Sequence, residues 1–145
     1  MKRFQILFLL CLALSFTFSI FAQDTKEVII LQTSDVHSRI EPINQKGDKY
    51  YNKGGFVRRA AFLEEFRKDH KNVLLFDCGD ISQGTPYYNM FRGEVEIKLM
   101  NEMGYDAMTI GNHEFDFDVD NMARIFKMAD FPVVCANYNL DATVL

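Results

Sequence analysis

Three short segments of this sequence each carry side chains of the types that can bind divalent metal ions. Asp35 and His37 are two residues apart, so in an extended backbone both side chains would project to the same side. In the second segment Gly79 permits a sharp turn and would leave the carboxylate of Asp80 at the tip of a loop. The third segment consists of Gly111, Asn112, His113 and Glu114. Carboxylate, imidazole and amide ligands together suit Zn²⁺, Mn²⁺, Fe or Co²⁺ better than Ca²⁺, which prefers an all-oxygen site.

Each of these segments directly follows a short apolar run. The runs are Val28 to Leu31, Val73 to Phe76 and Ala107 to Ile110, and a fourth covers Pro132 to Ala136. Continuous rather than alternating hydrophobicity predicts strands of a parallel sheet that are buried on both faces. Binding sites in open α/β sheets form outside the carboxyl ends of the strands, so the candidate ligands should meet at one edge of the sheet.

Longer segments with helical spacing separate the strands. The expected helices are Phe56 to Lys68, Glu94 to Met103 and about Val119 to Ala129. Their buried faces should carry Phe56, Ala60, Leu63 and Phe66 in the first helix, and Met122, Ile125, Phe126 and Ala129 in the third. Asp118 is a good N-cap for the third helix, Gly104 closes the second, and residues 41–55 read as a long polar surface loop. The alternation of strand and helix is typical of βαβ units in an α/β fold.

In their order and context these segments resemble the metallophosphoesterase, or calcineurin-like, superfamily. Three longer strings are similar to its 5'-nucleotidase branch, namely Leu31 to His37, Gly79 to Thr85 and Ile110 to Asp116. That branch includes bacterial UDP-sugar hydrolases and 2',3'-cyclic phosphodiesterases. The resemblance covers essentially all of Glu27 to Leu140. It implies that residues 23–145 form the N-terminal portion of the catalytic domain, the first half of an αββα sandwich built from βαβ units and incomplete in itself.

The resemblance also implies two divalent metal ions, of Zn, Mn, Co or Fe, and hydrolysis of phosphate esters. The expected substrates are 5'-nucleotides, which would give nucleosides and phosphate. Asp35 and His37 would bind the first ion, Asn112 would bind the second, and Asp80 would bridge the two. Two such ions lower the pKa of a shared water molecule and stabilise an in-line displacement at phosphorus.

Two further residues receive roles from the same resemblance. His113 would contact the phosphate and stabilise charge in the transition state rather than bind metal, and Asp116 would orient it. An imidazole held by a carboxylate keeps its orientation, and its positive form is favoured. Asp116 would also suit the start of a helix, where the helix dipole favours an acidic residue. Glu114 is interpreted as a loop-shaping residue that accepts hydrogen bonds from local backbone.

The family completes both metal sites with later histidines, including a Gly-His-x-His string, and binds the nucleobase with a separate C-terminal domain. This sequence has no histidine after His113. We expect the activity to belong to a longer protein, because an inert module would have little use for both His113 and Asp116. The alternatives are a catalytically inert module that binds metal or phosphate, and a half-domain whose missing half and nucleotide-binding domain come from a separate chain.

The N-terminal residues have the pattern of a secretory signal peptide. Lys2 and Arg3 precede an apolar stretch from Phe4 to Phe21, and the small residue Ala22 is followed by polar residues. Residues 1–22 are therefore expected to be removed, and the protein to be exported to the periplasm or cell surface. The alternative is an uncleaved membrane anchor, since the apolar stretch approaches the thickness of a bilayer. Cleavage after Ala22 would leave no stable membrane span.

The composition is that of an ordinary globular protein, with 48% hydrophobic and 25% charged residues in a chain of 145. The formal net charge is −4, and loss of the signal peptide would remove two positive charges and bring it to −6. No basic stripe is present, which argues against binding to nucleic acid. The mature chain would keep Cys78 and Cys135, either as a disulfide, which export permits, or as two buried free thiols.

Overall fold

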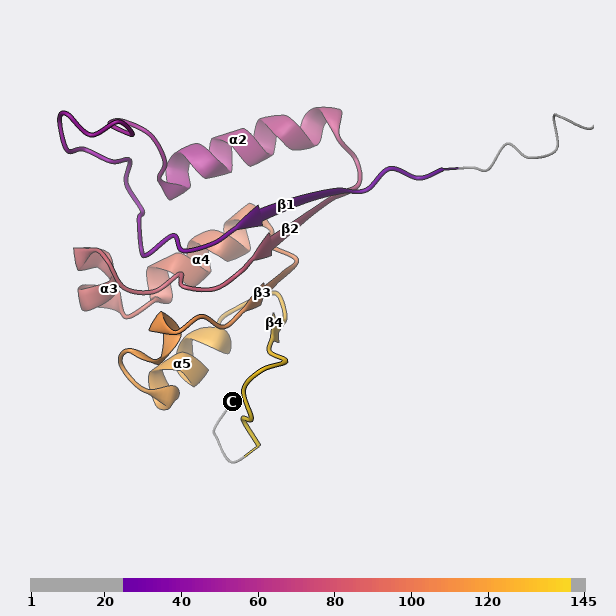
Figure 1. The fold of residues 1–145 in the computed structure, drawn as a ribbon. Coiled ribbons are helices and arrows are strands. Elements are labelled where there is room, and N and C mark those ends of the chain that lie inside the picture. Colours follow the sequence, from indigo (N-terminus) through magenta and orange to yellow (C-terminus); the bar gives the residue numbers. More distant parts are fainter. Residues whose placement is uncertain (1–24, 142–145) are drawn as a thin grey trace, which may run out of the picture.

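A four-stranded parallel sheet forms the centre of the structure (Figure 1), a computed structural model that describes residues 25–141. The strands are β1 (Ile29–Thr33), β2 (Val73–Asp77), β3 (Ala107–Thr109) and β4 (Val133–Val134). They lie side by side in sequence order, and each pairs in parallel with the next. The predicted α/β fold with a parallel sheet is therefore confirmed, although β4 is shorter than the apolar run that predicted it.

Residues 25–141 contain all three predicted helices and one more that was not expected. The helices are α2 (Phe56–Asp69), α3 (Pro86–Phe91), α4 (Glu94–Met103) and α5 (Val119–Phe126), with a short 3₁₀ helix, η2 (His113–Phe115), before α5. The unexpected α3 has only six residues, which is too short to show an apolar stripe. Asp118 caps α5 as predicted, because its Oδ1 accepts a hydrogen bond from the backbone N–H of Asn121 at 2.6 Å.

The ends and faces of the helices differ from the predictions in two places. α5 ends early because its last turn tightens: the N–H groups of Met128 and Ala129 donate to carbonyls three residues back. In α2, Phe56 and Leu63 are buried as predicted, but Ala60 is exposed. Ala60 lines an open groove between α2 and α4, so it does not reach the core.

Helices α2, α4 and α5 form a layer on one side of the sheet (Figure 1). α4 packs against both α2 and α5, and its Ile97 and Met100 share a core with Leu75 of β2. Leu75 is only 2% exposed, whereas Leu74 is 37% exposed and its partner in β1, Ile30, is 64% exposed. The expectation of strands buried on both faces is therefore wrong for residues 25–141, because α2, α4 and α5 all belong to the same layer.

Residues 41–55 contain turns but no helix or strand, as predicted for a long loop. Among residues 25–141 we find no helix with the length and hydropathy needed to cross a membrane. The predicted signal peptide, residues 1–22, lies outside the described residues. Cys78 and Cys135 are both free thiols, and Cys78 is exposed, so neither a disulfide nor a pair of buried thiols describes them.

Candidate metal centre

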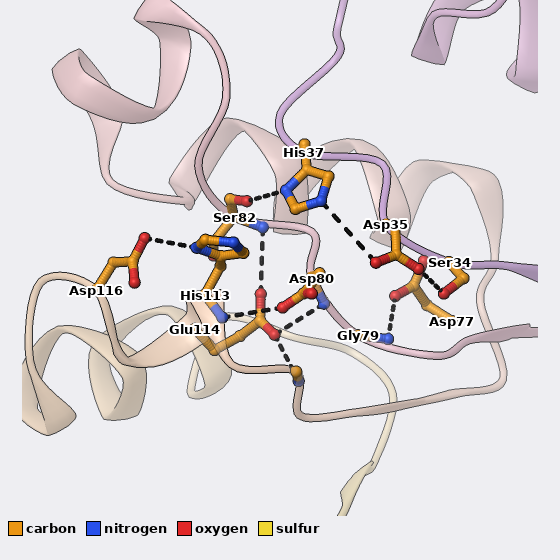
Figure 2. Close-up of polar contacts among 11 residues, drawn as sticks. Ser34, Asp35, His37, Asp77, Gly79, Asp80, Ser82, His113, Glu114 and Asp116 are labelled. Atoms are coloured by element: carbon orange, nitrogen blue, oxygen red, sulfur yellow. Dashed lines mark hydrogen bonds and ion pairs between the residues drawn. The ribbon is translucent and has the colours of Figure 1, made fainter.

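The candidate ligands converge at the carboxyl ends of β1, β2 and β3 (Figure 2). His37, Asp80 and His113 each offer one ligand atom, and these three atoms lie within 4.8 Å of one another. Oδ1 of Asp35 lies 3.9 Å from Nε2 of His37. Asn112 is exposed and directly precedes His113, at the start of η2. The parallel sheet therefore brings the three ligand-bearing segments to one edge, as the sequence led us to expect.

The loop after β1 has a strained backbone. Asp35, His37 and Ser38 have φ angles of 53°, 46° and 54°, in the left-handed region that is unfavourable for residues other than glycine. The extended backbone expected here is therefore wrong. The N–H groups of the three residues donate to the carbonyls of Gly79, Asp80 and Ile81, at N···O distances of 3.1, 3.1 and 2.7 Å. These bonds fasten the loop to the one after β2, and such support is what lets a strained backbone persist.

Gly79 allows the loop after β2 to pass directly against the loop after β3. Its φ is 93°, and a Cβ atom at this position would lie 2.5 Å from the backbone nitrogen of Gly111. The sharp turn predicted at Gly79 is confirmed. The next residue, Asp80, has an Oδ1 that accepts a hydrogen bond from the backbone N–H of His113 at 2.9 Å. The protein itself therefore fixes the orientation of the Asp80 carboxylate.

Glu114 connects the same two loops through hydrogen bonds. Its side chain is fully buried, and both carboxylate oxygens accept hydrogen bonds from backbone N–H groups. The donors are Gly111 at 2.7 Å, Asp80 at 2.9 Å and Ser82 at 3.1 Å. The interpretation as a loop-shaping residue is right, but the contacts are not only local, because two of the three donors belong to the loop after β2. Glu114 thereby sets the position of Asp80 relative to His113.

Glu114→Gln should lower the free energy of unfolding by about 1–3 kcal/mol, the cost of leaving a buried hydrogen-bonding group without a partner. The amide nitrogen would face a backbone N–H, so two donors would meet where a donor and an acceptor meet now. Urea unfolding measures the change. The matched control is Glu102→Gln, because Glu102 is exposed on α4. An equal, small effect of both substitutions would show that the Glu114 carboxylate does not hold the loops.

His113 is held by Asp116 on the outer side of the cluster. Nδ1 of His113 lies 2.8 Å from Oδ2 of Asp116, and this hydrogen bond raises the pKa of His113 above its ordinary value. With Nδ1 so engaged, Nε2 is the ring nitrogen left for another partner. The His113 ring also meets the His37 ring edge to face, with centroids 5.1 Å apart. Asp116 thus lies where it can orient the imidazole.

A buried carboxyl that the sequence interpretation did not single out lies at the end of β2. Asp77 is 2% exposed, its Oδ1 accepts from the N–H of Gly79 at 2.9 Å, and its Oδ2 accepts from the Thr33 hydroxyl at 2.5 Å. The Thr33 hydroxyl also lies 2.8 Å from the hydroxyl of Tyr105, to which Arg59 donates. Burial raises the pKa of Asp77 to about 6, against the opposing effect of these hydrogen bonds and of Arg59.

Asp77→Asn should remove a pH dependence of stability. The pKa of Asp77 is about 6 in the folded chain against an ordinary 3.8, so the folded chain holds more protons between these values and its stability falls as the pH rises. The loss is at most about 3 kcal/mol. The amide can accept a hydrogen bond from Gly79 and donate one to Thr33. The stability of the variant relative to the wild type should therefore increase as the pH rises from about 4 to about 7, as measured by urea unfolding. A stability difference that stays constant with pH would contradict this.

Comparisons with known proteins identify the family of the chain. Residues 28–142 match the model of the calcineurin-like phosphoesterase family. The chain belongs to this family. Among its relatives, a snake venom 5'-nucleotidase of Gloydius brevicauda is 43% identical over 115 residues, which is 77% of this chain and 20% of that protein.

Solved structures of nucleotidases share the fold. The 5'-nucleotidase precursor of Thermus thermophilus superposes with a TM-score of 0.75 at 35% identity, over 81% of this chain and 23% of that chain. The NAD nucleotidase of Haemophilus influenzae superposes with a TM-score of 0.67 at 35% identity, over 76% of this chain and 20% of that chain. The predicted metallophosphoesterase-type fold is thus confirmed. The chain spans about 20% of the length of the relatives it matches, and so only part of their domain.

Proposed function

We propose that residues 23–145 are the N-terminal portion of the catalytic domain of a phosphoric ester hydrolase, and that the whole protein hydrolyses 5'-nucleotides. The observation that carries the proposal is the convergence of His37, Asp80 and His113, whose ligand atoms lie within 4.8 Å of one another. They come from three separate loops, and three independent turns would have no structural reason to bring carboxylate and imidazole groups together. The nucleotide substrate is supported by the 5'-nucleotidases among the relatives.

The donors present are of the kinds that bind Zn, Mn, Co or Fe, and together with the remaining ligands of the domain they would serve two ions. Asp35 and His37 would hold the first ion, Asn112 would hold the second, and Asp80 would lie between them. Nδ1 of His37 lies 3.2 Å from the carbonyl oxygen of Ser82, so its Nε2 is the nitrogen left for an ion. Ions bound in this way supply positive charge next to the phosphate and lower the pKa of a water molecule.

His113 and Asp116 would serve the reaction through hydrogen bonding. The Asp116 carboxylate favours the positive form of the imidazole and leaves Nε2 free to donate to a phosphate oxygen. That oxygen gains negative charge as water attacks phosphorus and the bond from phosphorus to the nucleoside oxygen breaks. A donor held in place before the reaction stabilises this charge at no cost in reorganisation. The nucleoside oxygen leaves as an alcohol after it takes up a proton.

We also propose that the rest of the catalytic domain covers the open face of the sheet, where Ile30 and Leu74 are exposed. It would follow in a longer chain or come from a separate one, and would bring the remaining metal ligands and the nucleotide-binding domain. Export through residues 1–22, to the periplasm or cell surface, is supported by their pattern. It is also supported by the matches to a venom protein and to a protein described as a precursor.

The test is phosphate release by the longest form of the protein that contains this sequence. AMP, a UDP-sugar and NAD are compared with a generic aryl phosphate, each with added Mn²⁺ or Zn²⁺ and with a chelator. We expect metal-dependent release of phosphate, with AMP among the best substrates. Metal binding without hydrolysis of any of these esters would favour the inert module, and hydrolysis that survives the chelator would contradict the metal dependence.

A further inference from the structure

A buried carboxyl group that has no part in the proposed chemistry is hydrogen-bonded to the loop that carries Asp35 and His37. Glu96, in the first turn of α4, is 0% exposed. One of its oxygens, Oε1, accepts a hydrogen bond from the hydroxyl of Ser38. The other, Oε2, is buried without a hydrogen-bond partner among residues 25–141. Burial raises the pKa of Glu96, which shows how unfavourable a charge is at this place.

Ser38 is the residue that links Glu96 to the metal centre. It directly follows His37 in the strained loop, and both residues have positive φ angles, 46° for His37 and 54° for Ser38. The Thr85 hydroxyl also contacts Ser38. Its oxygen lies 2.7 Å from the carbonyl oxygen of Ser38 and 3.1 Å from the hydroxyl oxygen of Ser38. Ser38 therefore accepts a hydrogen bond from Thr85 and donates one to Glu96. These bonds fix its side chain between the loop before α3 and the start of α4.

We propose that Glu96 is a positioning residue, which holds the His37 imidazole in place for metal binding through the Ser38 hydroxyl. This inference rests on the proposed function only in taking His37 as a ligand. A left-handed residue relaxes to negative φ when its support is removed. For Ser38 that change would rotate the peptide between His37 and Ser38 and displace the imidazole from its place beside Asp35 and Asp80.

Stability alone does not account for a carboxyl group at this position. A buried carboxyl with one unpartnered oxygen destabilises the folded state relative to an apolar side chain of similar size. Glu96 lies among apolar residues of α4, since Ile97 and Met100 are fully buried beside it on the helix. The Ser38 hydroxyl is buried too, so the variant that separates the two roles replaces both partners, Ser38→Ala together with Glu96→Met. This double variant should keep or increase the stability of the wild type, while metal affinity falls. A merely structural role predicts that both quantities fall together.

The experiment compares Mn²⁺ affinity, measured by calorimetry, with urea unfolding of the same purified chain. Glu96→Met and Ser38→Ala should each weaken Mn²⁺ binding by about 10-fold or more, the usual effect of losing a partner that orients a metal ligand. The double variant should bind Mn²⁺ no more weakly than either single variant, because both substitutions break the same Ser38–Glu96 hydrogen bond. Glu96→Gln keeps an oxygen that accepts from Ser38 and should restore the affinity to within about 3-fold of the wild type.

Glu102→Gln, on the exposed face of α4, is the matched control and should bind Mn²⁺ like the wild type. The His37 ring resonances, recorded by NMR without metal, should move in Glu96→Met and not in Glu102→Gln. Wild-type binding with unchanged affinity and unchanged His37 resonances in Glu96→Met would overturn the positioning role and leave the proposed function intact. Absence of Mn²⁺ binding in the wild type would instead overturn the metal site, and the role of Glu96 with it.

Discussion

Asp80→Asn should reduce turnover by more than about 100-fold, beyond the effect of losing a residue that merely orients a metal ligand. Oδ1 of Asp80 accepts a hydrogen bond from the backbone N–H of His113 at 2.9 Å, and an amide oxygen can also accept this bond. The amide has no negative charge to share, however, so both proposed ions would be held less tightly at once. Initial rates with AMP at saturating Mn²⁺, in the longest form of the protein that contains this sequence, measure the loss.

Asp35→Asn is the informative comparison, because Asp35 would serve one ion only. At saturating metal it should lose less activity than Asp80→Asn, since the second ion keeps its ligands. Asp69→Asn, at the exposed end of α2, makes the same chemical change away from the site and should leave the rate unchanged. Equal losses in Asp80→Asn and Asp35→Asn would show that Asp80 does not bridge two ions.

His113→Asn should lower turnover by about 100- to 1,000-fold and leave the metal content unchanged. The imidazole is held by Asp116 at 2.8 Å and is assigned to the phosphate rather than to an ion. Its loss removes a donor that stabilises charge in the transition state, while the proposed ligands Asp35, His37, Asp80 and Asn112 stay in place. The two readouts are the initial rate with AMP and elemental analysis of the purified variant.

Bound metal lost from His113→Asn would make His113 a ligand instead. The geometry makes this a demanding test, because a ring nitrogen of His113 lies within 4.8 Å of ligand atoms of His37 and Asp80. His70→Asn, beyond the C-terminal end of α2, is the control and should change neither rate nor metal content.

The elements that place the site could be predicted from the sequence because each rests on a strong local pattern. Continuous apolar runs predicted β1, β2 and β3, and Asp118 and Gly104 marked helix ends that the structure confirms. Once the strands are parallel, their carboxyl ends must share an edge, so the meeting of the segments of Asp35, Asp80 and His113 follows from topology. The roles of these residues stay predictions.

The backbone conformation that orients the candidate ligands could not be predicted from the sequence, because it depends on contacts with residues distant in the sequence. The left-handed conformations of Asp35, His37 and Ser38 are held by hydrogen bonds to residues more than forty positions away. No local preference favours such a run, since each residue would avoid this region on its own. The exposed face of the sheet was not predicted for a similar reason. An apolar run predicts a buried strand but does not show which part of the protein covers each of its faces.

Buried carboxyls were the other feature that sequence reasoning missed. Glu94 and Glu96 look alike in the sequence, but Glu94 pairs with Lys98 on the surface and Glu96 is buried. The available signal was helical spacing, because Glu96 lies four and seven residues before Met100 and Met103, on the apolar stripe of α4. Asp77 carried a comparable signal at the end of the apolar run of β2.

The most direct test of a metal centre built from these loops is the number of ions bound per purified chain, with and without Asp80→Asn. We expect about one Mn²⁺ or Zn²⁺ per chain, lost in Asp80→Asn, with negligible hydrolysis of a generic phosphate ester by the chain alone. Absence of a bound ion, or binding that survives Asp80→Asn, would contradict the proposed centre. Two tightly held ions with steady hydrolysis would contradict the view that the rest of the domain is needed to complete it.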